Sequence, residues 1–136
     1  MRRYLIDTGP LAAYLLGRPW AVTALDPWLD RHEAATSILV YGEVTEYLQG
    51  LPDVATRLRQ FRQQLREIRP YALTYSIMER YATLRRSLRH GPGLIGDIDT
   101  LIAATAVERG LTVVTTDRDF QRVPSLSVML LPRNVP

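Results

Sequence analysis

The chain has 136 residues, of which 46% are apolar and 23% charged, and this is the size and composition of one globular domain. The absence of cysteine excludes disulfides, thiolate metal sites and cysteine nucleophiles. All 17 basic residues are arginine, so mechanisms that need a lysine, such as Walker-type nucleotide binding and Schiff-base catalysis, are excluded as well. We expect a single domain over residues 1–136. A cytoplasmic location is expected too, since the sequence shows neither a signal peptide nor an apolar run of about 18 residues.

The first half of the chain alternates between strand and helix patterns. Residues 4–6 are apolar and predict a buried strand, and residues 11–16, after a proline, predict a short helix. Residues 20–32 are predicted helical, although an internal proline weakens that pattern. Residues 34–36 predict a second strand. A serine then begins a helix over 37–48, which a glycine and a proline close.

The second half continues the alternation. Residues 53–68 and 75–89 are amphipathic and predict two helices. Residues 97–109 predict a helix that stops at a glycine. The runs 111–115 and 126–131 are apolar and predict two more strands. Strands that alternate with helices indicate an α/β fold with a mostly parallel sheet and helices on both faces, and its working site is expected at the carboxyl ends of the strands.

The net charge of +3 averages two unlike regions. Residues 57–89 carry nine arginines against two glutamates, a net charge of +7, and the remainder of the chain is −4. A basic segment beside acidic flanks predicts an anionic partner, with nucleic acid the first choice. A pair of solvated helices is the simpler alternative.

Two acidic residues fall at predicted strand ends, and three more are placed on or at the start of helices. Asp7 follows the first strand, and Asp117 follows the strand at 111–115. Glu43 falls on or near the apolar stripe of its helix, which indicates either a ligand role or a buried salt bridge to an arginine. Asp97 and Asp99 open one helix but point about 200° apart, so we expect Asp97 to cap the helix and Asp99 to face inward.

Together these segments resemble the PIN domain, and most of all the stand-alone VapC-type ribonuclease toxins of toxin–antitoxin pairs. The resemblance is based on YLIDT (4–8), a glutamate within a helix at 43, IGDIDTLIAATA (95–106) and VVTTDRDF (113–120). It implies that divalent metal is bound by Asp7, Glu43 and Asp99, with Asp117 as the fourth ligand and Asp119 a close second. It also implies that hydroxyls of Thr8 and Thr115 line the site, and we expect Asp97 there too.

An all-oxygen ligand set favours Mg²⁺ or Mn²⁺, as one or two ions, rather than zinc. Such a site is suited to endonucleolytic hydrolysis of RNA, with Arg85, Arg86 and Arg89 expected to hold substrate phosphates. His32 and His90 lie outside the acidic set and are read as surface residues. A housekeeping RNA-processing nuclease and a non-catalytic RNA- or protein-binding PIN module stay open as alternatives.

The resemblance also implies a protein partner, a small antitoxin that holds the toxin inactive. Its tail is expected either in the acidic site or along a helical groove. Apolar residues of the early helices could line that groove or a homodimer contact, and they are Leu15, Leu16, Trp20 and Trp28. We expect one of the two tryptophans to be ordinary core packing.

Overall fold

The structure, a computed structural model, describes residues 1–132. The elements in chain order are β1 (Tyr4–Ile6), α1 (Thr8–Leu15), α2 (Pro19–Asp30), β2 (Ala34–Ser37), α3 (Ile38–Gln49), α4 (Val54–Gln64), β3 (Arg69–Tyr71), α5 (Tyr75–Arg89), α6 (Asp97–Arg109), β4 (Thr112–Thr115), the 3-10 helix η1 (Arg118–Arg122) and β5 (Val128–Leu130). The predicted alternation of strands and helices is therefore confirmed.

The strands form one parallel sheet in the order β3-β2-β1-β4-β5. β1 is central, and its Leu5 is paired with Ala35 of β2 on one side and with Val113 of β4 on the other. The chain moves outward from β1 to β2 and β3, and then returns to β4 on the opposite side of β1. Open parallel sheets bind ligands at such a switch point, outside the carboxyl ends of the strands. The topology thus predicts a site between the ends of β1 and β4.

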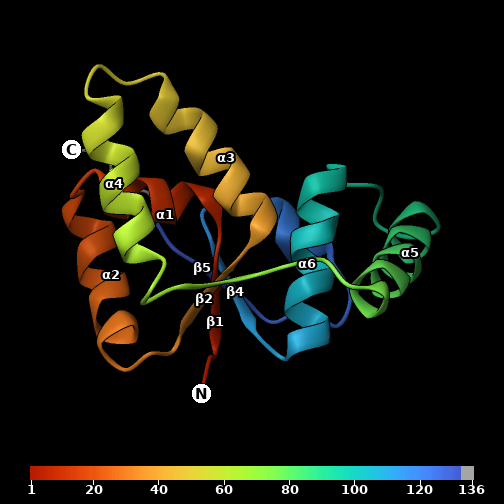
Figure 1. The fold of residues 1–136 in the computed structure, drawn as a ribbon. Coiled ribbons are helices and arrows are strands. Elements are labelled where there is room, and N and C mark those ends of the chain that lie inside the picture. The colour runs from red at the N-terminus through yellow and green to blue at the C-terminus, as the bar shows by residue number, and fades with distance from the viewer. Residues whose placement is uncertain (133–136) are drawn as a thin grey trace.

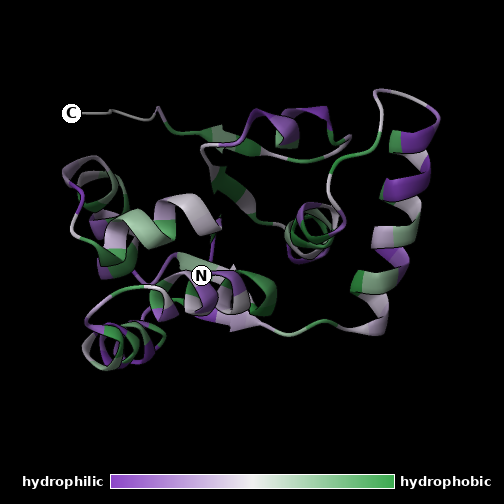
Figure 2. Ribbon diagram, turned by 90° about the horizontal axis from the view of Figure 1, so that it is seen from above, coloured by the Kyte–Doolittle hydropathy of each residue, from purple (hydrophilic) through white to green (hydrophobic). Residues whose placement is uncertain are grey.

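Helices cover both faces of the sheet, as predicted. Figure 1 shows α1, α2 and α4 on one side of the strands and α6 on the other. α3 packs against α1 and α4 and also against α6, so it connects the two layers. α5 packs mainly on α6. Figure 2 shows α5 as an outer layer, with the more hydrophobic α6 between it and the strands.

Local sequence signals explain where several helices begin and end. The Ser37 side chain accepts a hydrogen bond from the Leu39 N–H at 3.1 Å and caps α3, as predicted. Thr74 caps α5 in the same way, accepting from the Ile77 N–H at 3.2 Å. Gly110 ends α6 with a φ of 67°, a left-handed conformation that glycine adopts without strain.

One strand was not predicted. β3 is Arg-Pro-Tyr, a sequence without an apolar run, and it lies at the edge of the sheet, where proline is tolerated. The helix predicted over 53–68 accordingly ends earlier, at Gln64, and a turn leads from it into β3. The prediction failed here because β3 is defined by pairing with β2, which is not a local property of the sequence.

The core lies between the sheet and its helices. Phe61 of α4 and Phe120 of η1 are among its largest fully buried side chains. Trp28 stacks on Tyr4 with ring centroids 4.2 Å apart and packs against the core, as expected for one of the tryptophans. Within residues 1–132, no helix combines the length and the apolar character needed to cross a membrane.

Candidate active site

Asp7 lies at the carboxyl end of β1 and is buried, with 7% of its surface exposed. It occupies the N-cap position of α1, but its side chain does not cap the helix. Instead, the Thr115 hydroxyl at the end of β4 donates a hydrogen bond of 2.7 Å to Asp7 Oδ2. Burial raises the pKa of Asp7, and the charges of Glu43 and Asp117 add to this effect, whereas the Thr115 hydrogen bond opposes it. Asp7 and Thr115 therefore meet across the predicted switch point.

Glu43 reaches the same place from α3. Its Oε1 accepts a hydrogen bond of 2.6 Å from the hydroxyl of Thr8, the first residue of α1. A salt bridge between Glu43 and an arginine, the alternative prediction, is not found within residues 1–132. Glu43 instead accepts the hydrogen bond from this hydroxyl. Thr8 thus joins Glu43 to the segment that carries Asp7.

Asp97 and Asp99 point in different directions from the start of α6, as their spacing predicts. The expectation that Asp97 caps the helix is wrong, because Gly96 occupies the N-cap position and Asp97 is already helical. The Asp97 carboxylate instead accepts from Arg85 Nε on α5 at 3.2 Å. Asp99 faces inward, and its pKa is raised to about 6 by burial first and then by the charges of Asp7, Asp117, Glu43 and Asp119.

The loop after β4 supplies the remaining acids. Asp117 Oδ1 accepts from the Asp119 N–H at 2.9 Å and so begins η1, while the Asp117 N–H donates to the Thr115 hydroxyl at 3.0 Å. Asp119 forms an exposed ion pair with Arg122 at 3.1 Å. The charge of Asp117 acts on both Asp7 and Asp99, whereas the charge of Asp119 acts on Asp99 more weakly than those of the other acids. On this electrostatic basis we group Asp117, rather than Asp119, with the other three acids.

These four residues, Asp7, Glu43, Asp99 and Asp117, are called the acidic cluster below. Their charges act on one another, yet within residues 1–132 no three acidic side chains stand together in a geometry that would hold an ion. Burial and neighbouring charges raise the pKa values of Asp7 and Asp99, and a divalent cation bound beside their oxygens would offset that cost.

Comparison with known proteins agrees with this geometry. The PIN domain family matches residues 4–126 of the chain. The chain belongs to the PIN-domain family. The resemblance inferred from its acidic motifs is thereby confirmed.

Individual relatives of this PIN domain are distant in sequence but similar in length. Ribonuclease VapC4 of Mycobacterium tuberculosis (strain ATCC 25618 / H37Rv) is 29% identical over 136 residues, which covers 96% of this chain and 98% of the relative. A VapBC complex of Salmonella typhimurium bound to DNA contains a chain with a TM-score of 0.85, 18% identity and coverage of 97% and 100%. VapBC2 of Rickettsia felis, bound to a DNA fragment from its promoter, gives a TM-score of 0.83, 21% identity and coverage of 95% and 98%. At these identities the structures show the fold alone.

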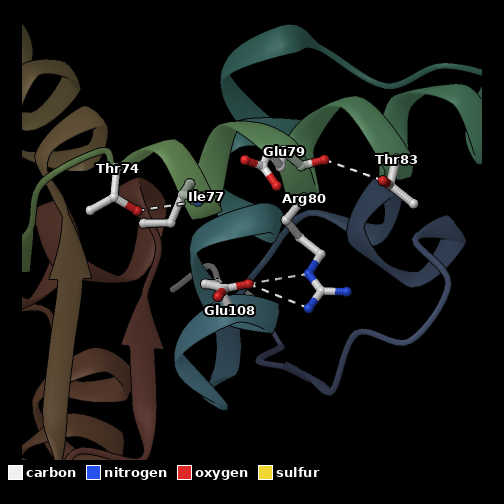
Figure 3. A network of polar contacts seen from close by, with 6 residues as sticks. All are labelled: Thr74, Ile77, Glu79, Arg80, Thr83 and Glu108. Atoms are coloured by element: carbon white, nitrogen blue, oxygen red, sulfur yellow. Dashed lines mark hydrogen bonds and ion pairs between the residues drawn. The ribbon is translucent and has the colours of Figure 1, made fainter.

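The arginines of the basic segment, residues 57–89, are divided between two opposite sides of the PIN domain. The arginines before residue 67 lie on or just after α4, and those from residue 80 onward lie on α5, at the far side of the molecule in Figure 1. Arg85 is engaged by Asp97, while Arg86 and Arg89 are exposed. Figure 3 shows Arg80 of α5 bonded to Glu108 of α6 through two nitrogens, at 3.3 and 3.4 Å. Sequence reasoning found the charge but not these partners.

A hollow beside the acidic cluster is lined by apolar side chains that sequence reasoning missed. Glu43 and Thr8 form part of its wall, together with Ile38, Tyr47 and Ile98, which are each about two-fifths exposed. One signal for this hollow was present in the sequence: Ile38 is apolar and begins α3, but it does not belong to the buried stripe of that helix.

Two further hollows lie beside α1. Leu16 and Trp20, which were predicted to line a partner groove, line the second hollow, and Leu15 lines the third, between α1, α2 and α4. His32 and His90 are exposed, as expected.

Proposed function

We propose that the chain is a metal-dependent endoribonuclease and the toxin of a VapBC-type toxin–antitoxin pair. The observation that supports this proposal is that the charges of Glu43 and Asp117 act on both Asp7 and Asp99 near the switch point of the sheet. Burial and these charges raise the pKa values of Asp7 and Asp99, and a bound cation would offset that cost. The similarity to a ribonuclease over nearly the whole chain supports the same reading.

The acidic cluster would hold Mg²⁺ or Mn²⁺, as one or two ions, with Asp119 as the alternative to Asp117. When bound, such an ion supplies an activated water and stabilises the leaving oxygen of a phosphodiester. Thr8 and Thr115 orient the carboxylates of Glu43 and Asp7 through the hydrogen bonds described above. Arg86 and Arg89 are exposed and available to RNA phosphates, whereas Arg85 must first leave Asp97.

A small antitoxin protein is the proposed partner, and the cytoplasm is the proposed location. Support comes from the similarity to chains that belong to VapBC complexes. The hollow between α1, α2 and α4 has both apolar and polar lining, from Leu15, Leu16 and Tyr14 to Asp26 and Arg57, which suits an amphipathic segment. A homodimer stays a prediction, to be checked by sedimentation of the isolated chain.

The test is cleavage of RNA by purified protein with Mg²⁺ or Mn²⁺ and with EDTA. We expect cleavage by the wild type only with metal, and its loss in Asp7→Asn and Asp99→Asn. Glu108→Gln is the matched control, because it removes a carboxylate from the same helix as Asp99 but at its other end, where Glu108 pairs with Arg80. Equal cleavage by wild type, Asp7→Asn and Asp99→Asn would refute the assignment. Failure of the wild type to bind Mn²⁺ at millimolar concentration in calorimetry would favour a non-catalytic module.

A further inference from the structure

α4 carries a row of arginines that the fold does not use. Arg59, Arg62 and Arg66 are spaced by three and four residues, so they share one side of the helix and of the turn that follows it. All three are exposed. At a rise of about 1.5 Å per residue they span about 10 Å along the axis. We call these three residues the α4 arginine row.

No acid opposes this row within residues 1–132. The sequence from residue 54 to 66 contains neither aspartate nor glutamate. The two acids that flank it are engaged elsewhere, Asp53 by Arg57 at 3.0 Å and Glu67 by His32 at 3.3 Å. Three positive charges therefore lie side by side on the surface, where they repel one another unless an anion binds.

The structural duties of α4 belong to other residues. Phe61 is fully buried, and Leu58 and Leu65 pack against the core beside it. Arg57 holds α4 to α1, since its Nη1 donates to the Leu15 carbonyl at 3.2 Å. Nothing in the packing of α4 requires arginine at the three positions of the row, so an external ligand is the simplest reason for the charge.

The chemistry of this face is that of a phosphate-binding surface. Guanidinium groups bind phosphate oxygens through charge-assisted hydrogen bonds, and arginine is a frequent phosphate contact in nucleic-acid complexes. The large apolar side chains exposed on the described part of the chain all lie outside α4. A protein interface usually has an apolar core, so an RNA backbone suits this face better than a protein segment does.

We propose that the α4 arginine row is a second RNA-binding surface, which holds the phosphate backbone of single-stranded RNA away from the site of cleavage. This inference rests on the proposed function, since it assigns a further contact to the same substrate. α4 and α5 lie at opposite sides of the molecule in Figure 1, so this surface is separate from the exposed arginines of α5. Binding through phosphates is independent of base sequence and falls steeply with salt.

The experiment measures how the affinity for a fluorescent 30-nucleotide RNA depends on salt. Every protein carries Asp99→Asn, so that the RNA stays intact. For single strands, each phosphate contact contributes about 0.7 to the slope of log affinity against log salt concentration. The variant R59Q/R62Q/R66Q should therefore lower that slope by about 2 and weaken binding at least tenfold at the lowest salt. R59K/R62K/R66K keeps the charge and should keep most of the slope.

A matched control removes the same number of charges elsewhere. R3Q/R31Q/R80Q neutralises three exposed arginines that are each in an ion pair, two of them with the mostly buried Glu33, and we expect its slope to stay near the parent value. An equal fall in slope for the glutamine variant and this control would overturn the proposal. So would an unchanged slope for a glutamine variant that no longer binds the cognate antitoxin, since the row would then serve a protein. Circular dichroism checks that each variant is folded.

The two proposals fail in different ways. Cleavage by the protein without Asp99→Asn tests the nuclease function, whereas the salt slope tests the surface. A wild type that does not cleave RNA while the α4 variants show the expected slopes would leave an RNA-binding module. A wild type that cleaves while the α4 variants show the parent slope would leave a nuclease without this surface.

Discussion

Replacing Asp99 with asparagine should make the metal-free protein more stable at neutral pH while it abolishes cleavage. The folded protein raises the pKa of Asp99 from its ordinary 3.8 to about 6. A difference of that size corresponds to about 3 kcal/mol at neutral pH, and contact of this side chain with solvent reduces it to about 1–2 kcal/mol. The variant also loses a favourable interaction with the start of α6, about 0.3–1 kcal/mol. We therefore expect a net gain of about 1 kcal/mol.

The sign of the pH dependence follows from the direction of the pKa change. Because the folded-state pKa is raised, the protonated carboxyl is favoured in the folded state. The contribution of Asp99 to stability is fully present below pH 3.8 and is lost as the pH rises through about 6. Asparagine does not ionise, so the gain of the variant should be small at pH 4 and reach its full size above pH 7.

Thermal unfolding in EDTA at pH 4, 5.5 and 7.5 measures this effect. For a domain of this size, 1 kcal/mol corresponds to about 4 °C in the midpoint. Asp97→Asn is the control, since it lies in the same helix turn but bonds to Arg85, and it should be neutral or slightly destabilising. Added Mg²⁺ should raise the midpoint of the wild type more than that of Asp99→Asn. A variant less stable than wild type at pH 7.5 would refute the claim that burial and neighbouring charges disfavour the ionised Asp99.

Three further changes test other parts of the structure. Thr115→Val removes the hydroxyl bonded to Asp7, so the pKa of Asp7 should rise further and the acidic limb of the pH–rate profile should move to higher pH, with cleavage reduced about tenfold or more. Phe61→Ala should lower the free energy of unfolding by about 3–5 kcal/mol in urea titrations, because the ring is fully buried. Arg80→Gln breaks an exposed pair with Glu108 and should change that free energy by less than about 1 kcal/mol.

The parts of the fold that the sequence predicted are those with strong local signals. β1 and β4 are short apolar runs, and α6 has small apolar residues between an acidic start and a glycine stop. β3 has no such signal. It exists because it pairs with β2, in a register that sets Tyr71 against Ser37. Pairing between segments over thirty residues apart cannot be read from either segment alone.

The residues of the candidate site also include some that the sequence predicts and some that it does not. Asp7 and Asp117 were predictable because they follow strands, and parallel strands end at one edge of the sheet. The resemblance to the PIN domain selected Glu43 from among other helix acids. The prediction for Asp97 failed because Gly96, with non-helical backbone angles, takes the N-cap position one residue earlier. Which arginines are already paired depends on the packing of α5 on α6, and no pattern in the sequence reports that.

Hydroxyl groups explain how the fold keeps the carboxylates of a buried crevice in place before any cation arrives. Thr115 bonds to one oxygen of Asp7, and Thr8 bonds to one oxygen of Glu43. A carboxylate can accept about four hydrogen bonds, so a single neutral donor fixes its direction and leaves capacity for a cation and its waters. An arginine in either place would also satisfy the carboxylate, but its charge would compete with the cation. Neutral donors beside the acidic cluster, with the arginines of α4 and α5 kept at the periphery, would thus suit the proposed cation-dependent nuclease.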